Sequence, residues 1–139
     1  MKNILLFLLL IFFLGCDGKV FKNINDKSKI GIKIEKIEID STDLFSNKFI
    51  KSALQKKGFL VEKSEYKLSV EHRSYKNSCN NALVKATSNT AYDGLVAITL
   101  FYKESKIYTA YMDYRGKLSE AHFTKLIDEM MDDLEIKKE

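Results

Sequence analysis

Apolar and polar residues alternate in several segments after residue 29, and this spacing predicts β-strands. The isoleucines of the first segment change parity near Glu35-Lys36, which indicates a bulge. In a later segment, Tyr66, Leu68 and Val70 share one face and polar residues occupy the other, as in a strand with one buried face. Strands are therefore predicted over 30–39, over 59–74 with a polar interruption at 62–65, over 95–102 and over 107–114.

Two other segments have the apolar spacing of amphipathic helices. In the first, residues 44–54 carry an apolar stripe, Asp43 and its polar neighbours offer N-cap side chains, and Gly58 is suited to end the helix. In the second, Ser119 precedes a stripe that extends from Phe123 to Leu134. The order β-α-β-β-β-α predicts an α+β two-layer sandwich: a mainly antiparallel four-stranded sheet with two helices on one face.

The start of the chain has the pattern of an export signal. Lys2 is followed by eleven consecutive Ile, Leu or Phe residues at 4–14, a run shorter than the roughly 20 residues that a membrane-spanning helix needs. The run ends at Phe13-Leu14-Gly15-Cys16. This ending resembles the lipobox of small bacterial envelope lipoproteins, in which the Cys is acylated and becomes the new N-terminus. The resemblance implies a lipoprotein signal peptide at 1–15 and lipidation at Cys16.

Acylation of Cys16 would anchor the protein to a bilayer. Stable anchoring requires two or more fatty chains, and an acylated lipoprotein cysteine carries at least two, palmitate among them. We expect a periplasm-facing location in the bacterial cell envelope, with the outer membrane favoured. Asp17 resembles the retention signal of inner-membrane lipoproteins, so the inner membrane stays open as an alternative. Segment 16–29 is polar without periodicity and is predicted to be a flexible tether, which leaves one α+β domain at 30–136.

A second resemblance lies in the stretch 49–70. It contains a helix, then Lys57-Gly58-Phe59-Leu60-Val61, then Glu65-Tyr66-Lys67-Leu68-Ser69-Val70. This order resembles the LPS-assembly lipoprotein family LptE and the auxiliary α/β lipoproteins of ABC transporters and polysaccharide export. The resemblance implies a partner-binding domain without catalytic activity.

Charge and composition narrow the function classes further. The chain has 139 residues, and 23 basic against 19 acidic side chains give a net charge of +4, too little to predict nucleic-acid binding. Two cysteines exclude a disulfide scaffold and a four-cysteine zinc site. With Cys16 acylated, Cys79 lies in a long polar loop at 77–93 and is a candidate for an intermolecular disulfide, although an unpaired thiol without a role is the simpler interpretation.

Catalytic and metal-binding groups are sparse. His72 and His122 are the two histidines, and neither has a sequence neighbour suited to a hydrolytic triad or a metal site, so structural roles are favoured. Acidic residues crowd positions 128–135, where a divalent cation or a basic partner could bind, although a solvated helix face is the simpler interpretation. We therefore expect no enzyme activity, and no cofactor beyond the acyl lipid on Cys16.

Tyrosines are the candidate contact residues. Tyr108 and Tyr114 share one face of the last strand and Tyr111 takes the other, and one of these faces must lie away from the helices. Exposed tyrosine suits protein contacts because it joins an apolar ring to a polar tip. The alternative is cross-strand packing that shields the sheet. We expect an adaptor or an assembly or transport accessory that binds an envelope protein; the alternative is a lipid- or glycan-binding groove between helices and sheet.

Overall fold

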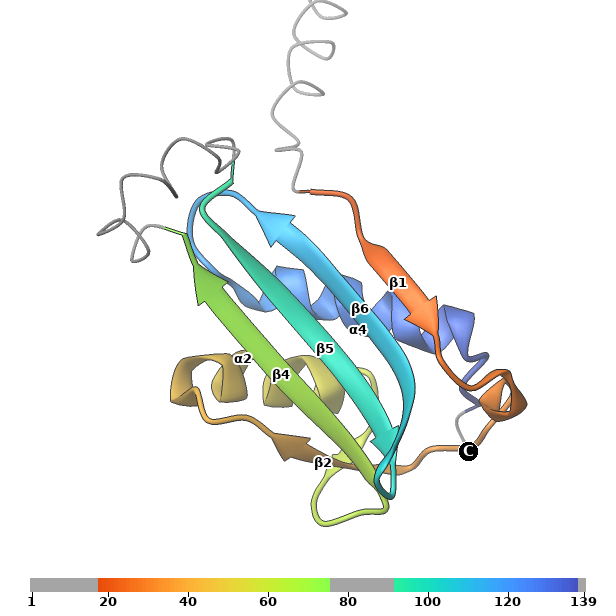
Figure 1. The fold of residues 1–139 in the computed structure, drawn as a ribbon. Helices are drawn as coiled ribbons and strands as arrows, with labels where there is room; N and C mark the ends of the chain where they lie inside the picture. Colours follow the sequence, from red (N-terminus) through yellow and green to blue (C-terminus); the bar gives the residue numbers. More distant parts are fainter. Residues whose placement is uncertain (1–17, 76–91, 138–139) are drawn as a thin grey trace, which may run out of the picture.

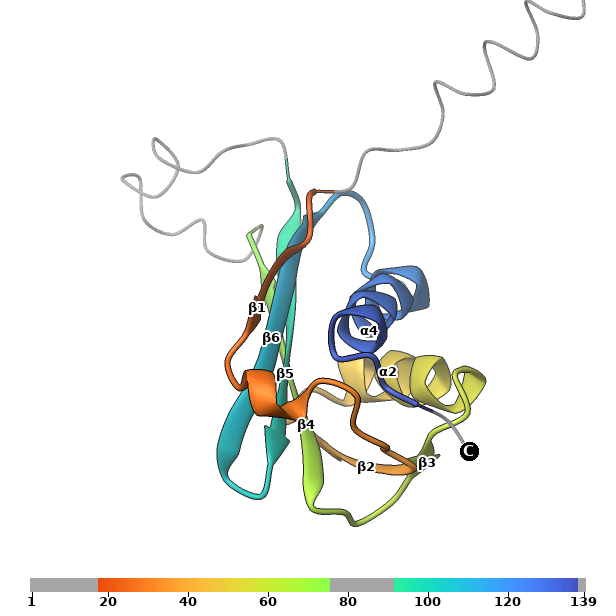
Figure 2. The same cartoon turned by 90° about the vertical axis from the view of Figure 1, so that its right-hand side faces the viewer.

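The protein folds into two layers. A computed structural model describes residues 18–75 and 92–137, which form a six-stranded sheet with two helices on one face (Figures 1 and 2). The predicted α+β class and the two helices are confirmed. The predicted number of four strands is wrong, because the described residues form six strands. The sheet is also mixed, since β2 pairs parallel with two of its neighbours.

The elements follow one another with short connections. In chain order they are β1 (Phe21–Ile24), the 3-10 helix η1 (Lys27–Lys29), β2 (Lys36–Asp40), α2 (Leu44–Lys56), β3 (Leu60–Val61), β4 (Tyr66–Ser74), β5 (Gly94–Tyr102), β6 (Ser105–Tyr114) and α4 (Glu120–Asp133).

The strand order in the sheet is β1-β6-β5-β4-β2-β3. The four strands at the start of this order pair antiparallel, whereas β2 pairs parallel with both β4 and β3. The parallel pairing arises because helix α2 carries the chain back across the sheet between β2 and the strands that follow it.

One additional strand lies inside the predicted tether. Within segment 16–29, the residues of β1 pair with β6, so that Phe21 lies opposite Tyr111. The tether prediction is therefore wrong for these residues. Lys22, which faces the helix side, forms ion pairs with Glu129 and Asp133 of α4. Because an ion-pairing lysine occupies an inward position, this strand lacks the apolar alternation by which strands are predicted.

The other additional strand comes from dividing the segment 59–74. Strand β3 pairs with one side of β2, and β4 pairs with the other side. The polar residues between them pass around the end of β2, where the Ser64 hydroxyl donates to the Lys36 carbonyl over 2.8 Å. The polar interruption in the sequence is therefore the connection that carries the chain from one side of β2 to the other.

The predicted first strand is also shorter than expected, since β2 begins at Lys36 rather than at residue 30. The isoleucine-rich residues before it connect β1, at one edge of the sheet, to β2 near the other edge. Their backbone bonds reach the end of α4: Gly31 N–H donates to the Leu134 carbonyl over 2.7 Å, and Lys137 N–H donates to the Ile32 carbonyl over 3.1 Å. Of the alternating isoleucines, Ile34 is buried in the core, Ile32 packs against it and Ile30 is exposed, so their spacing reflects a packed connection and not a long strand.

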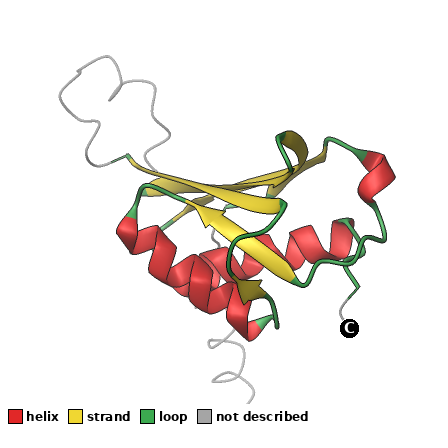
Figure 3. Ribbon diagram, turned by 90° about the horizontal axis from the view of Figure 1, so that it is seen from below, coloured by secondary structure: helices red, strands yellow, loops and turns green. Residues whose placement is uncertain are grey.

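Both helices begin and end where the sequence predicts. Asp43 caps α2 by accepting from the backbone N–H of Phe45 and of Ser46, and Gly58 follows the helix with a φ of 88°. Ser119 caps α4. The helices lie beneath the sheet in Figure 3, and their stripes form the core with the inward residues of the strands. The fully buried members include Ile50, Leu54, Leu68, Val96, Ile98, Leu100, Met112, Phe123, Leu126 and Ile127.

Gly94, the first residue of β5, is required by close packing. A Cβ at this position would lie 2.5 Å from the Arg73 carbonyl oxygen and 2.5 Å from the Tyr114 hydroxyl. Since the Tyr114 hydroxyl itself contacts His72 over 2.7 Å, glycine makes the room in which this polar contact forms.

We predict that Gly94→Ala lowers the free energy of unfolding by about 3 kcal/mol, because the added methyl group overlaps backbone and side-chain atoms. Gly116→Ala is the matched control: its site has a φ of 76° and open space, so only a conformational cost of about 1 kcal/mol is expected. Urea unfolding followed by circular dichroism measures both values. An equal or smaller loss for Gly94→Ala would contradict the packing described here.

Candidate partner-binding site

Both helices lie on one face of the sheet, and no described element covers the other face (Figure 2). On this face the central strand β5 presents Leu95, Ala97, Thr99 and Phe101, all of them half-buried. The adjacent strand β4 presents more polar residues, such as Lys67 and Ser69. The open face is therefore apolar along its centre and polar on the side of β4.

An aromatic pair stands on the same face. Phe21 of β1 and Tyr111 of β6 lie opposite each other, with stacked rings whose centroids are 5.1 Å apart and whose planes differ by 15°. The two residues nevertheless remain 46% and 39% exposed. Two large rings that stack and stay in contact with water form a preorganised apolar surface, which is the kind of surface that protein interfaces use.

Tyr108 and Tyr114 lie on the helix side of β6 and are buried, with 0% and 4% exposure. The interpretation of these two tyrosines as exposed contact residues is therefore wrong. They turn inward because α4 covers this face of the strand. Of the three predicted contact tyrosines, Tyr111 alone is exposed, and the structure adds Phe21 beside it.

Tyr108 joins β6 to the end of α4. Its hydroxyl donates to Asp133 Oδ2 over 2.9 Å, and Lys22 Nζ lies 2.9 Å from Asp133 Oδ1. Burial, together with the hydrogen bond to the carboxylate, raises the pKa of Tyr108 far above its ordinary value. Asp133 thus links β1, β6 and α4, which holds the edge strand in place.

Four polar side chains form a chain of contacts between the starts of α2 and α4. His72 Nε2 lies 2.7 Å from the Tyr114 hydroxyl, and His72 Nδ1 lies 3.6 Å from Asp43 Oδ2. The ring of His122 lies 5.2 Å from that of Tyr114, and its Nδ1 accepts a hydrogen bond from the Ser119 backbone N–H. The partners of His72 are therefore distant in the chain, whereas His122 combines a bond to its chain neighbour Ser119 with a ring contact to the distant Tyr114.

This polar cluster connects β4 and β6 to the starts of both helices. Asp43 is the N-cap of α2, and Ser119, the partner of His122, is the N-cap of α4. The sequence analysis did not predict this cluster, because it considered only residues close to each histidine in the chain. The alternation of β4 places His72 on the inward face, and this was the signal that a buried polar partner is needed. Because the cluster contains or contacts the N-cap residue of each helix, it can fix how the starts of α2 and α4 are oriented against the sheet.

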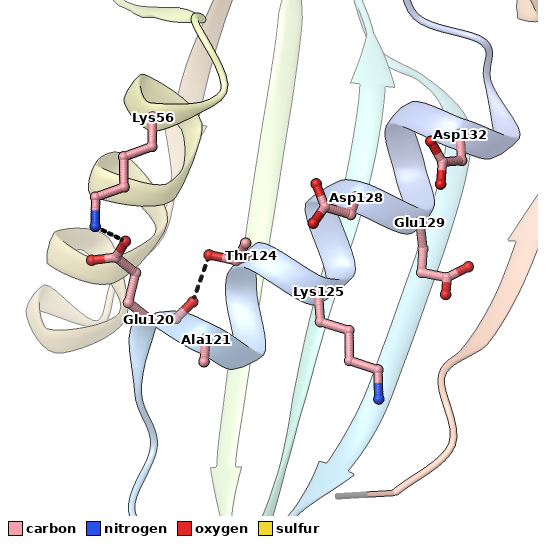
Figure 4. A pocket seen from close by; sticks show the side chains of 8 residues that line it. All are labelled: Lys56, Glu120, Ala121, Thr124, Lys125, Asp128, Glu129 and Asp132. Carbon is pink, nitrogen blue, oxygen red and sulfur yellow. Dashed lines mark hydrogen bonds and ion pairs between the residues drawn. The ribbon is translucent and has the colours of Figure 1, made fainter. Parts of the chain in front are cut away.

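The acidic residues of α4 border a hollow of about 650 Å³, shown in Figure 4. Basic side chains from other elements neutralise several of them: Lys57 pairs with Asp128, Lys56 pairs with Glu120, and Lys22 pairs with Glu129. Within residues 18–75 and 92–137, no group of three or more His, Cys, Asp or Glu side chains is arranged to hold a metal ion.

A second exposed apolar patch lies at the start of α2. Leu44 and Phe45, which the sequence assigned to the buried helix stripe, are 86% and 63% exposed. The Phe45 ring packs edge-on against Phe49, with centroids 5.1 Å apart. These residues occupy the first turn, which projects beyond the sheet, so the helix period alone does not bury them.

Two predicted sites, Cys16 and Cys79, lie outside the described residues. Among the residues that are described, no helix is both long and apolar enough to cross a bilayer. A scan against models of known protein families gives no match, and a search of curated proteins gives none either.

The cap of α2 predicts a specific pH dependence. Hydrogen bonds, chiefly from the Ser46 hydroxyl and also from backbone N–H groups, hold the pKa of Asp43 below its ordinary value. This stabilisation is present above the unfolded-state pKa of about 3.9 and is lost as the pH falls through that value toward the folded-state pKa. We predict that Asp43→Asn, which still caps the helix but does not titrate, loses less stability than the wild type between about pH 5 and pH 2.5.

Asp40→Asn is the matched control, because Asp40 is an exposed aspartate that ends β2 and is not the helix cap. Urea unfolding at several pH values measures the three proteins. The same loss of stability in Asp43→Asn as in the wild type would contradict the assigned role of the carboxylate.

Proposed function

We propose that the protein is a membrane-anchored lipoprotein of the bacterial cell envelope. It acts as a non-enzymatic adaptor that binds an extended segment of an envelope protein at strand β1 and the Phe21–Tyr111 pair. The outer membrane is the favoured location. The lipid on Cys16 supplies the membrane attachment, and the open sheet face supplies the contact.

The anchor is supported by the sequence. Lys2, the apolar run at 4–14 and the Gly15-Cys16 ending have the order of a lipoprotein signal. An acylated cysteine with two or more chains holds a protein on a bilayer without a spanning helix. Anchoring also raises the effective concentration of the binding face near other membrane-bound proteins, so a weak interface is sufficient.

The observation that carries the binding proposal is the exposed stack of Phe21 on Tyr111 at the edge of the sheet. Strand β1 is the last strand on its side in the described sheet, so its outer backbone groups suit an added strand. A segment paired there would place every second side chain on the open face, beside the Phe21 ring. A partner with an apolar side chain at that position fits both features.

The alternative, a lipid- or glycan-binding groove between helices and sheet, has less support. Such a groove needs apolar residues of the helices to line an open space. Ile50 and Leu54 of α2, and Leu126 and Ile127 of α4, are fully buried in the core that the helices share with the sheet. We therefore place the contact on the outer face.

We predict that a photo-crosslinking amino acid at Tyr111 forms an adduct with an envelope protein in living cells, while the same probe at Lys125, on the exposed side of α4, does not. Phe21→Ser should weaken the Tyr111 adduct about tenfold or more, because buried aromatic contacts contribute about 2 kcal/mol at interfaces. Gel mobility and mass spectrometry identify the adduct.

Phe45→Ser is the control for Phe21→Ser, since Phe45 is an exposed phenylalanine on a different element. It should leave the adduct unchanged. Cys16→Ser should abolish lipid labelling and reduce the adduct through loss of membrane attachment. Adducts of equal strength at Tyr111 and Lys125, or an adduct indifferent to Phe21→Ser, would overturn the assigned face.

A further inference from the structure

The first described residue is attached to the sheet. The Gly18 backbone N–H donates to the Asp113 carbonyl at the end of β6 over 2.9 Å, and Gly18 is buried. A Cβ on Gly18 would lie 2.7 Å from that same carbonyl oxygen, so this close approach requires glycine. The chain is thus fixed to the domain from residue 18 onward.

This attachment shortens the distance to the proposed anchor. Two residues span at most about 7 Å, whereas the fourteen residues of the predicted tether 16–29 would span about 45 Å. If Cys16 is acylated, as the proposed function states, its lipid must enter the bilayer next to Gly18. The domain is then held against the headgroups by the end of the sheet that contains Gly18; this end is called the anchor end below.

The anchor end also contains the end of β4, the start of β5 and the connection from β6 to α4 (Figure 1). Four exposed cations lie there: Lys19, Arg73, Arg115 and Lys117, of which Arg73 pairs with Glu71. Within the described residues, neither Lys19 nor Lys117 forms an ion pair, whereas Lys22 and Lys56 each pair with a carboxylate.

The carboxylates of the anchor end are engaged by the protein itself. Asp93 Oδ2 accepts from the Gly116 backbone N–H over 2.6 Å, and Asp113 Oδ1 accepts from the Tyr75 hydroxyl over 2.6 Å. Burial and this hydrogen bond raise the pKa of Tyr75 to about 12. Both carboxylates are half-buried, so the described residues of the anchor end present mainly positive charge outward.

Aromatic residues accompany these cations. The Arg115 guanidinium lies 5.1 Å from the ring centre of Tyr92, and Tyr75 lies across the same end of the sheet. Tyrosine rings with polar tips, next to basic side chains, are typical of surfaces that lie at the level of lipid headgroups. Charge and aromatic content therefore agree with the position that the short connection imposes.

We infer that the anchor end lies on the membrane surface, with Lys19, Arg115 and Lys117 in contact with the phosphates of anionic lipids and the strands directed away from the bilayer. This inference rests on the proposed lipid anchor. It also places the Phe21–Tyr111 pair about 10 Å from the headgroups, since Phe21 follows Gly18 by three residues. The partner segment would then be a membrane-proximal part of an envelope protein.

The test uses the intact acylated lipoprotein in vesicles of phosphatidylglycerol and phosphatidylethanolamine, in a Cys79→Ser background. A spin label is placed at the anchor end by Arg73→Cys or at the β5–β6 turn by Glu104→Cys. A paramagnetic ion chelated to lipid headgroups relaxes nearby labels. Since nine-residue β5 separates the two ends by about 30 Å, relaxation should be at least about fivefold stronger for the label at position 73.

Charge reversal tests the phosphate contact. Lys19→Glu with Lys117→Glu should reduce the contrast between the two labels by about half or more, because repulsion tilts the anchor end from an anionic surface. The matched control, Lys27→Glu with Lys106→Glu, reverses two exposed lysines near the β5–β6 turn at the opposite end and should preserve the contrast. In vesicles of neutral phosphatidylcholine, both double variants should behave as the wild type does.

The outcomes separate this inference from the proposed function. Mass spectrometry first establishes whether Cys16 is acylated, and an unmodified cysteine would overturn both. Equal relaxation of the two labels in the acylated protein would overturn the inferred orientation alone. An equal response to the two double variants would overturn the phosphate contact, with the anchor and the partner-binding face intact.

Discussion

The pairing of β1 with β6 holds the first described strand to the domain, and the proposed binding face is built on it. Three features lie along this edge of the sheet: the Gly18 backbone bond to Asp113, the stack of Phe21 on Tyr111, and the inward side chain of Lys22. Lys22 adds ion pairs to α4, so the edge strand is bound to both layers. Without this pairing, residues 18–24 would not be held against the sheet and the stack of Phe21 on Tyr111 would not form.

Side chains of β6 point alternately toward the helices and toward the open face of the sheet. Residues that point inward, among them Tyr108 and Tyr114, meet α4 and the polar cluster around His72, where each hydroxyl finds a partner. Tyr111, three residues from Tyr114, points outward to Phe21. A buried hydroxyl needs a hydrogen-bond partner, whereas an exposed ring offers its surface to another protein. The same residue type therefore serves the core on one face and, in the proposed function, partner contact on the other.

Much of the fold follows from local patterns in the sequence, because the helices and the central strands bury a regular set of apolar positions. The caps Asp43 and Ser119, the terminator Gly58 and the strands β4, β5 and β6 were all predictable in this way. Strand β1 was not, because its inward Lys22 is stabilised by carboxylates more than one hundred positions away in the chain. The isoleucines before β2 suggested a longer strand, but Ile32 and Ile34 pack against the core in a connection that precedes β2.

The candidate site was predictable only in part. The spacing of the tyrosines indicated that Tyr111 faces away from the other two, but not which face the helices cover. Phe21 lacked any signal, since its role depends on a register that long-range pairing sets. The cluster of Asp43, His72, Tyr114 and His122 likewise comes from four separate elements.

Hydrogen–deuterium exchange on the intact protein tests the β1–β6 pairing most directly. Backbone amides that bond across a sheet exchange only when the pairing opens, whereas those of a free linker exchange at the intrinsic rate. We predict that a peptide covering residues 18–24 retains slowly exchanging amides, as the peptide from β6 does. Lys22→Glu should accelerate the exchange of residues 18–24 and leave that of β5 unchanged. Exchange of residues 18–24 at the intrinsic rate in the wild-type protein would contradict the β1–β6 pairing.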